Sequence, residues 1–198
     1  MRILCSVSLA LALAGCGGGK VTSDDEAALA WVGLEGMVSK ALALGLQGFN
    51  QASSANIDAQ TGEGDETGTL TVTGQADQGA SDNKGLRLEV ALDDYSDLVD
   101  VDDDEDEEIS LTYDTEETGP LATDLALRDM PDGTLTGTLA GAVGMIGDLE
   151  GPVTLALDLD GTTEDDGSGG AALVDGATRV TGTVTNDGGG VYGVDVTR

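Results

Sequence analysis

The fold is decided by the stretch Val153-Thr154-Leu155-Ala156-Leu157-Asp158-Leu159-Asp160. Its large apolar residues occupy every second position, and the positions between them carry Thr, Ala or Asp. Successive side chains of a β-strand point to opposite faces of a sheet, so this alternation predicts a strand with one buried and one solvated face. Strands of parallel sheets are typically apolar on both faces, whereas antiparallel sheets are often solvated on one. The stretch therefore predicts an antiparallel sheet.

Seven other segments repeat this period of two. They cover residues 70–72, 86–92, 109–113, 124–128, 134–139, 180–185 and 192–196. Thr is frequent at their polar positions, as expected of a β-branched residue on a pleated surface. The sequence Met130-Pro131-Asp132-Gly133 and the sequence Asn186-Asp187-Gly188-Gly189 are typical of tight turns, which join strands that follow each other in the chain. We expect about eight strands, paired mostly with their sequence neighbours.

One helix is predicted before the strands. Ser23-Asp24-Asp25-Glu26 fits a capping box, and the acids suit the positive end of the helix dipole. Large and small apolar residues then recur at a spacing of three or four, from Ala27 through Trp31 and beyond. We predict a helix from about Asp24 to about Gly48, with its apolar side in the core and Trp31 buried. The polar residues 50–66 are expected to form a loop.

The sizes of these elements constrain their arrangement. Eight strands make a sheet about 38 Å wide, whereas one helix is about 10 Å across. A flat sheet of that width would leave most of its apolar face exposed. We therefore predict a mainly β fold with one N-terminal α-helix, in which a strongly curved antiparallel sheet, a half-barrel or a barrel, packs on the helix. Gly74, Gly137 and Gly182 lie inside strands and mark positions where the sheet bends or a neighbouring backbone comes close.

The N-terminus carries a different signal. Arg2 is followed by a short uncharged run that ends in Leu13-Ala14-Gly15-Cys16. A run this short cannot span a bilayer as a permanent helix, which needs about 20 residues, and it is typical of a secretory signal. The four residues resemble the lipobox of bacterial lipoproteins.

That resemblance implies a domain organisation and a location. Residues 1–15 would be a signal peptide, residues 16–22 the lipidated Cys16 with a flexible tether, and residues 23–198 a single domain. The thiol of Cys16 would carry a covalent lipid such as palmitate and hold the protein to a membrane of the cell envelope. Gly17 is not the Asp that retains lipoproteins at the inner membrane in enteric-type sorting. The resemblance therefore implies the outer membrane.

Charge and composition limit the partners that the protein can bind and the reactions that it can catalyse. The formal net charge of −30 argues against nucleic-acid binding, which relies on clustered Lys and Arg. It also predicts repulsion from anionic lipid headgroups, so that the covalent lipid alone would provide the anchor. There is no His, Cys5 would leave with the signal peptide, and the sulfur of Cys16 would carry lipid. Catalytic triads and thiol chemistry are thereby excluded, and we expect neither enzymatic activity nor an organic cofactor.

An acidic segment raises the question of calcium. Asp100, Asp102 and Asp104, with Asp106 next in the series, have the alternate spacing of ligands in a calcium-binding loop. However, Glu105 stands where that loop has Gly, and Leu111 where it has a bidentate Glu. The preferred interpretation is a solvated loop between strands. The alternative is a calcium-binding surface or adhesion module.

The leading functional hypothesis concerns the apolar face of the sheet. Six of its residues share that face by their parity within the strands: Leu88, Val90, Leu111, Leu125, Leu155 and Leu157. In a closed sheet they would fill the interior, whereas in a partly open one, which we expect, they would line a groove. The architecture is similar to periplasmic lipoprotein carriers of the LolA/LolB type. We expect a non-catalytic envelope lipoprotein that binds an apolar ligand or a partner protein through its sheet.

Overall fold

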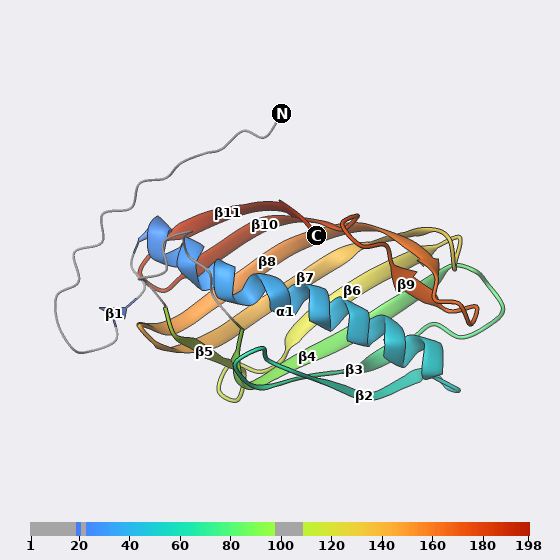
Figure 1. Ribbon diagram of the computed structural model, residues 1–198, viewed down its shortest axis with the longest axis horizontal. Helices are drawn as coiled ribbons and strands as arrows, with labels where there is room; N and C mark the ends of the chain where they lie inside the picture. The colour runs from blue at the N-terminus through green and yellow to red at the C-terminus, as the bar shows by residue number, and fades with distance from the viewer. Residues whose placement is uncertain (1–18, 21–22, 98–108) are drawn as a thin grey trace.

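The computed structural model describes residues 19, 20, 23–97 and 109–198. Helix α1 (Asp24–Gln51) lies diagonally across the concave face of one curved antiparallel sheet (Figure 1). The strands are β1 (Gly19–Lys20), β2 (Asn56–Glu63), β3 (Thr67–Ala76), β4 (Lys84–Ser96), β5 (Leu111–Asp114), β6 (Leu121–Arg128), β7 (Thr134–Gly147), β8 (Leu149–Asp165), β9 (Ala171–Leu173), β10 (Arg179–Asn186) and β11 (Val191–Thr197). The predicted fold class is confirmed.

Helix α1 begins at the predicted capping box. The Ser23 hydroxyl oxygen accepts a hydrogen bond from the backbone N–H of Glu26 at 3.2 Å, and the Glu26 carboxylate accepts one from the N–H of Ser23 at 3.0 Å. The helix ends at Gln51, three residues later than predicted. It is long and apolar enough to cross a membrane, but 56% of its most apolar window is buried inside the fold. Trp31 is 1% exposed, so the prediction of a core helix is confirmed.

The sheet is an eight-lane meander in which the neighbouring lanes follow each other in the chain. Its order is β2, β3, β4, then β5 and β6 end to end, then β7, β8, β10 and β11. The segments predicted at 109–113 and 124–128 therefore share one lane. Between them Thr115 keeps the lane attached to β4, because its N–H donates to the carbonyl oxygen of Leu92 at 3.1 Å.

One predicted loop contains a strand. β2 lies within residues 50–66 and forms the first lane, so the prediction of a loop there is wrong in part. Its sequence hides the period of two, because β2 is an edge strand whose only buried residue is Ile57. The predicted tether is also partly paired, since Gly19 and Lys20 of β1 lie in parallel beside Leu149 and Glu150 of β8.

The sheet forms a partial ring. Its lanes end at β2 and β11, and no ladder joins these two strands in the described part of the chain. Helix α1 contacts both of them and crosses the opening between the two edges (Figure 1). The helix thus covers the side of the ring that the strands leave open.

Glycines opposite leucines make room on the concave face. Gly182 pairs with Leu157, and Gly74 with Leu88. Gly182 has a φ of 141°, and a Cβ atom there would overlap the carbonyl oxygen of Ala156 on the next strand. Close approach of a neighbouring backbone is thus why glycine stands there, as predicted. The absent side chain also leaves space for the leucine across the ladder, which suits the crowded inside of a curved sheet.

Candidate functional site

The six residues predicted to line a groove lie in the packed core. Leu88, Val90, Leu111, Leu125, Leu155 and Leu157 are each 2% exposed or less. Leu88 packs directly beneath Gly45 of α1. The helix and the curvature of the sheet together cover the apolar face, and these six positions form no open groove. A ligand at the concave face would have to bind elsewhere.

The other predicted sites fall outside the described residues. Cys16 precedes them, and Asp100, Asp102, Asp104 and Asp106 belong to the omitted segment 98–108. Within the described residues, no three Asp, Glu, His or Cys side chains are grouped so that they could hold a metal ion. Lipidation and calcium binding therefore stay predictions from the sequence.

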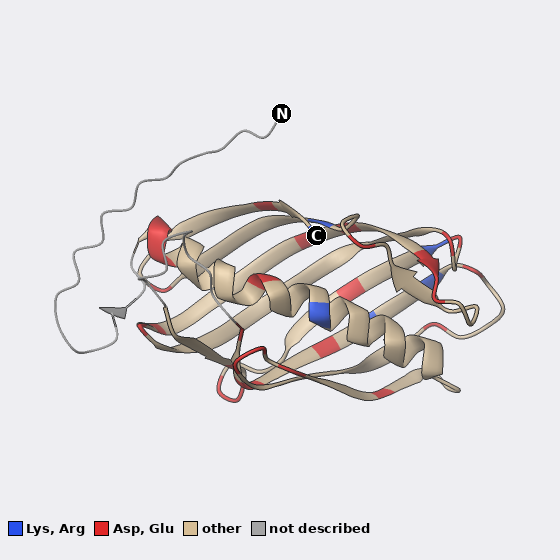
Figure 2. Ribbon diagram, in the orientation of Figure 1, with Lys and Arg blue, Asp and Glu red and all other residues tan. Residues whose placement is uncertain are grey.

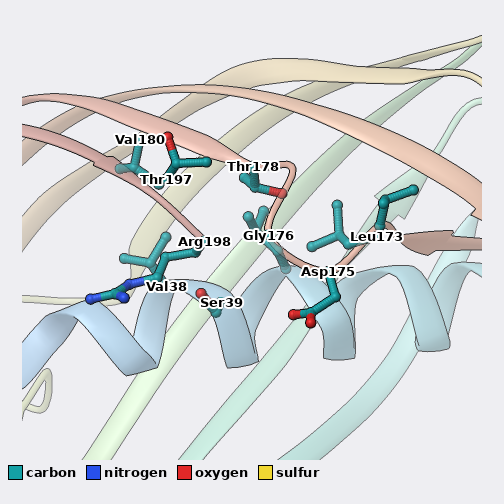
Figure 3. Close-up of a pocket in the computed structure, with 11 residues that line it drawn as sticks. Val38, Ser39, Leu173, Asp175, Gly176, Thr178, Val180, Thr197 and Arg198 are labelled. Atoms are coloured by element: carbon teal, nitrogen blue, oxygen red, sulfur yellow. The ribbon is translucent and has the colours of Figure 1, made fainter. Parts of the chain in front are cut away.

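Two grooves flank α1 on the side that faces β9 to β11. The first, the Thr178 groove, has a volume of about 490 Å³ and lies between the middle of α1 and the segment that leads from β9 into β10 (Figure 3). It is lined by Val38, Ser39, Leu42, Leu173, Val174, Asp175, Gly176, Thr178, Val180, Thr197 and Arg198. Thr178 is 4% exposed, and its hydroxyl oxygen has no hydrogen-bond partner. That oxygen is buried against Gly161 of β8 and does not open into the groove. The groove thus combines apolar residues with the polar side chains of Ser39, Asp175, Thr197 and Arg198.

The second, the Asn50 groove, continues along the same side of α1 towards its C-terminal end. It also has a volume of about 490 Å³. Its lining residues are Ala43, Leu46, Gln47, Asn50, Gln51, Asp166, Ser168, Ala171, Ala172 and Leu173. Leu173 of β9 lines both grooves. The two grooves thus lie next to each other along α1, beside β9.

On the opposite side of α1, glycines allow the helix to pack closely against its neighbours. Gly33, Gly36, Gly45 and Gly48 face β2 to β5, and a Cβ atom on any of them would overlap a side chain of the sheet or of Asp97. At Gly33 the overlapping group is the hydroxyl of Tyr113, which donates a hydrogen bond to the carbonyl oxygen of Ala30 at 3.0 Å. We call this the glycine side of α1, and the side that bears the two grooves the groove side.

A partly buried cluster of ion pairs lies on the glycine side. The Lys40 ammonium group donates to the Asp97 carboxylate at 2.7 Å and to the Asp65 carboxylate at 2.8 Å. Asp97 is 7% exposed. It also accepts hydrogen bonds from the Tyr95 hydroxyl at 2.5 Å and from the N–H of Asp65 at 2.9 Å. Because the carboxylate of Asp97 has several donors, its burial as an ion is compensated.

The ion pair shifts the ionisation of its neighbours. Burial alone would lower the pKa of Lys40, but the hydrogen bonds and charges of Asp65 and Asp97 outweigh it and raise the pKa above its ordinary value. Burial, followed by the hydrogen bond to Asp97, raises the pKa of Tyr95 well above its ordinary value. At neutral pH both groups therefore keep their protons, and the contact is intact.

The groove side carries polar contacts whose partners are more exposed than Asp97. Arg198 forms an ion pair with Glu35 of α1. Near the end of the helix, the Asn50 amide donates to the Asp166 carboxylate at 3.1 Å and to the carbonyl oxygen of Ala171 at 3.0 Å. These contacts leave the space between them free for the grooves.

Sequence reasoning missed both the ion pair and the grooves. Lys40 and Asp97 are 57 residues apart, and only the curvature of the sheet brings them together. One signal was present, because Lys40 is the only basic residue of α1 (Figure 2). The grooves depend on β9, a strand of three residues with no alternation to reveal it.

Comparisons with protein-family models, with curated proteins and with solved structures found no match to this chain.

Proposed function

We propose that this chain is a non-catalytic lipoprotein of the cell envelope, acylated on Cys16 and held at the outer membrane, that binds a small amphipathic ligand beside α1. The observation that carries the ligand-binding part is the pair of adjoining grooves along α1. Binding sites for small molecules have volumes of about 300–1,000 Å³, mostly apolar walls and a few polar groups that orient the ligand. The Thr178 groove has these properties.

The lining residues indicate the chemistry of the ligand. Val38, Leu42 and Val180 offer apolar contact, and Leu173 extends this wall into the Asn50 groove. The polar side chains of the lining are those of Ser39, Asp175, Thr197 and Arg198. A single-chain amphiphile would suit both features, with its chain along α1 and its head group among these polar residues.

Ligand binding is tested with a fluorescent long-chain fatty acid and the soluble domain from Ser23 onwards. Ser39 lies at the wall of the Thr178 groove, and Ser39→Trp fills that space without entering the core (Figure 3). We expect Ser39→Trp and Leu173→Asp to lower the affinity at least tenfold. Ser81→Trp, in an exposed loop away from α1, is the matched control and should bind like the unmodified domain. Equal affinity in all four proteins would refute the proposed site.

Anchoring is tested separately in cells. Acyl chains contribute about 0.8 kcal/mol per buried CH₂ group to membrane binding, so Cys16→Ser should release the protein from the membrane fraction or leave it unprocessed. Mass spectrometry of the membrane-extracted protein would show both the lipid on the N-terminal residue and any ligand that co-purifies. Normal cleavage with continued membrane binding of the Ser variant would contradict the anchor.

A further inference from the structure

One end of the molecule carries the exposed large hydrophobic side chains. Ile146 is 63% exposed and Val191 is 48% exposed, and the rest of the described surface has no other large hydrophobic residue as exposed as these. Ile146 is near the end of β7, and Val191 begins β11. Both point to the convex side of the sheet. Two exposed aliphatic residues at the same end of an acidic protein call for an explanation.

The chain enters the fold at this same end. Gly19 and Lys20 of β1 lie beside Leu149 and Glu150, directly after the turn that follows Ile146. The start of α1 is also there, because the N–H of Val191 donates to the Asp24 carboxylate at 2.8 Å. Figure 1 shows β1 and the beginning of α1 together at one end of the long axis. We call this the entry end of the molecule.

The distance from Cys16 to the entry end is short. Three residues span at most about 11 Å when fully extended, so Gly19 lies within about 11 Å of Cys16 whatever the path between them. If Cys16 carries lipid in a bilayer, the entry end cannot be far from the headgroups. The opposite end is remote, because the stretch of β8 from Glu150 to Thr162 extends for about 40 Å.

We propose that, in the lipid-anchored protein, the entry end rests on the bilayer surface with Ile146 and Val191 in the interfacial layer. This proposal rests on the acylation of Cys16 in the proposed function. Moving two aliphatic side chains out of water stabilises such a contact in proportion to their apolar area. Because the lipid anchor already holds the protein at the membrane, this small contribution is enough to orient it. We choose the bilayer as the contacting surface because the chain from Cys16 enters the fold at this end. The two exposed side chains alone would not identify it.

The charge of the entry end determines which kind of bilayer surface it can approach. The entry end also carries acidic residues, namely Asp24, Asp25, Asp148, Glu150 and Asp187. Figure 2 shows acidic segments at the start of α1 and at turns of this end. An anionic leaflet would repel them, whereas a zwitterionic leaflet would not. The contact should therefore be close on phosphatidylcholine or phosphatidylethanolamine and weaker when anionic lipid is added at low salt.

The test uses the acylated full chain reconstituted into vesicles. Ile146→Cys and Val191→Cys are labelled with an environment-sensitive fluorophore, since the sulfur of Cys16 is blocked by lipid. Thr162→Cys, on an exposed site at the opposite end of β8, is the matched control. With headgroup-spin-labelled phosphatidylcholine, we expect quenching at positions 146 and 191 to exceed that at 162 several-fold. Phosphatidylglycerol at low salt should reduce this difference, and added salt should restore it.

The outcomes separate the two proposals. Flotation of the protein with vesicles reports the anchor, and quenching reports the orientation. A protein that floats but is quenched equally at all three positions, or most at 162, overturns the orientation and leaves the anchor standing. A protein that lacks the lipid and does not float refutes the anchor and the orientation with it.

Discussion

Helix α1 meets the two halves of the sheet in different ways. On the glycine side, four residues without side chains let the helix backbone approach β2 to β5. On the groove side, larger residues such as Val38 and Leu42 leave gaps of about 490 Å³ against β9 to β11. Glycine is unfavourable within a helix by about 1 kcal/mol relative to alanine. Glycines thus lower the helix propensity of α1 where its contact with the sheet is closest. Space remains on the groove side, where the proposed ligand would bind.

Removing the largest buried side chain of α1 should have the largest effect. Trp31 is fully buried on α1, so Trp31→Ala should lower the free energy of unfolding by about 3–5 kcal/mol. Urea denaturation would measure this, with exposed Ala43→Ser as the control. Since Trp31 is the only tryptophan, its emission should be blue-shifted in the native state. A loss below 1 kcal/mol, or a red-shifted native spectrum, would show that helix docking matters little on either side.

The ion pairs on the two sides of α1 should differ in strength. Lys40→Met leaves the carboxylate of Asp97 buried without its ammonium partner and should lower the free energy of unfolding by about 2 kcal/mol. Glu35→Gln removes the ion pair with the half-exposed Arg198 on the groove side and should cost at most about 1 kcal/mol. Denaturant titrations of both variants make the comparison. Equal losses in the free energy of unfolding would show that the glycine side and the groove side do not differ in this respect.

A small substitution should be tolerated on the groove side of α1 and not on the glycine side. Gly33→Ala gains helix propensity but presses a methyl group against the Tyr113 hydroxyl, so we expect a net loss of about 1–3 kcal/mol. Ser39→Ala on the groove side should change stability by less than about 0.5 kcal/mol. Tyr113→Phe added to Gly33→Ala should recover part of the loss, because the hydroxyl is the most severe overlap. If the double variant is no more stable than Gly33→Ala, the clash lies elsewhere.

High pH should loosen the glycine side first. The pKa values of Tyr95 and Lys40 are raised in the fold, so the stability that they provide is complete below their unfolded pKa values near 10 and is lost as pH rises through the folded values. Tyr95→Phe should cost about 1 kcal/mol at pH 7. Above about pH 10 the difference between Tyr95→Phe and the unmodified protein should shrink. A difference that stays constant from pH 7 to pH 11 would contradict this assignment.

The sequence predicted the sheet better than the site, for a physical reason. Alternation in stretches such as 153–160 records which face is wet, and that is a local property. β2 was missed because Ile57 is its only buried residue, so its sequence does not alternate. The contact of Lys40 with Asp97 and the grooves at Leu173 depend on how far the sheet curves and where the helix crosses it. No single stretch of sequence carries that information.

The path of α1 also sets the order in which the protein can be completed. Each lane of the sheet pairs with its predecessor, so the lanes can assemble as the chain is synthesised from its N-terminus. Helix α1 is made before any of them, yet its partners Asp166, Val191 and Arg198 are made late. The apolar residues on the groove side of the helix therefore stay exposed to water until β9 to β11 have been made. A chain that stops short of β9 would present this surface to any other hydrophobic segment, and such incomplete chains should be the form of this protein most prone to aggregate.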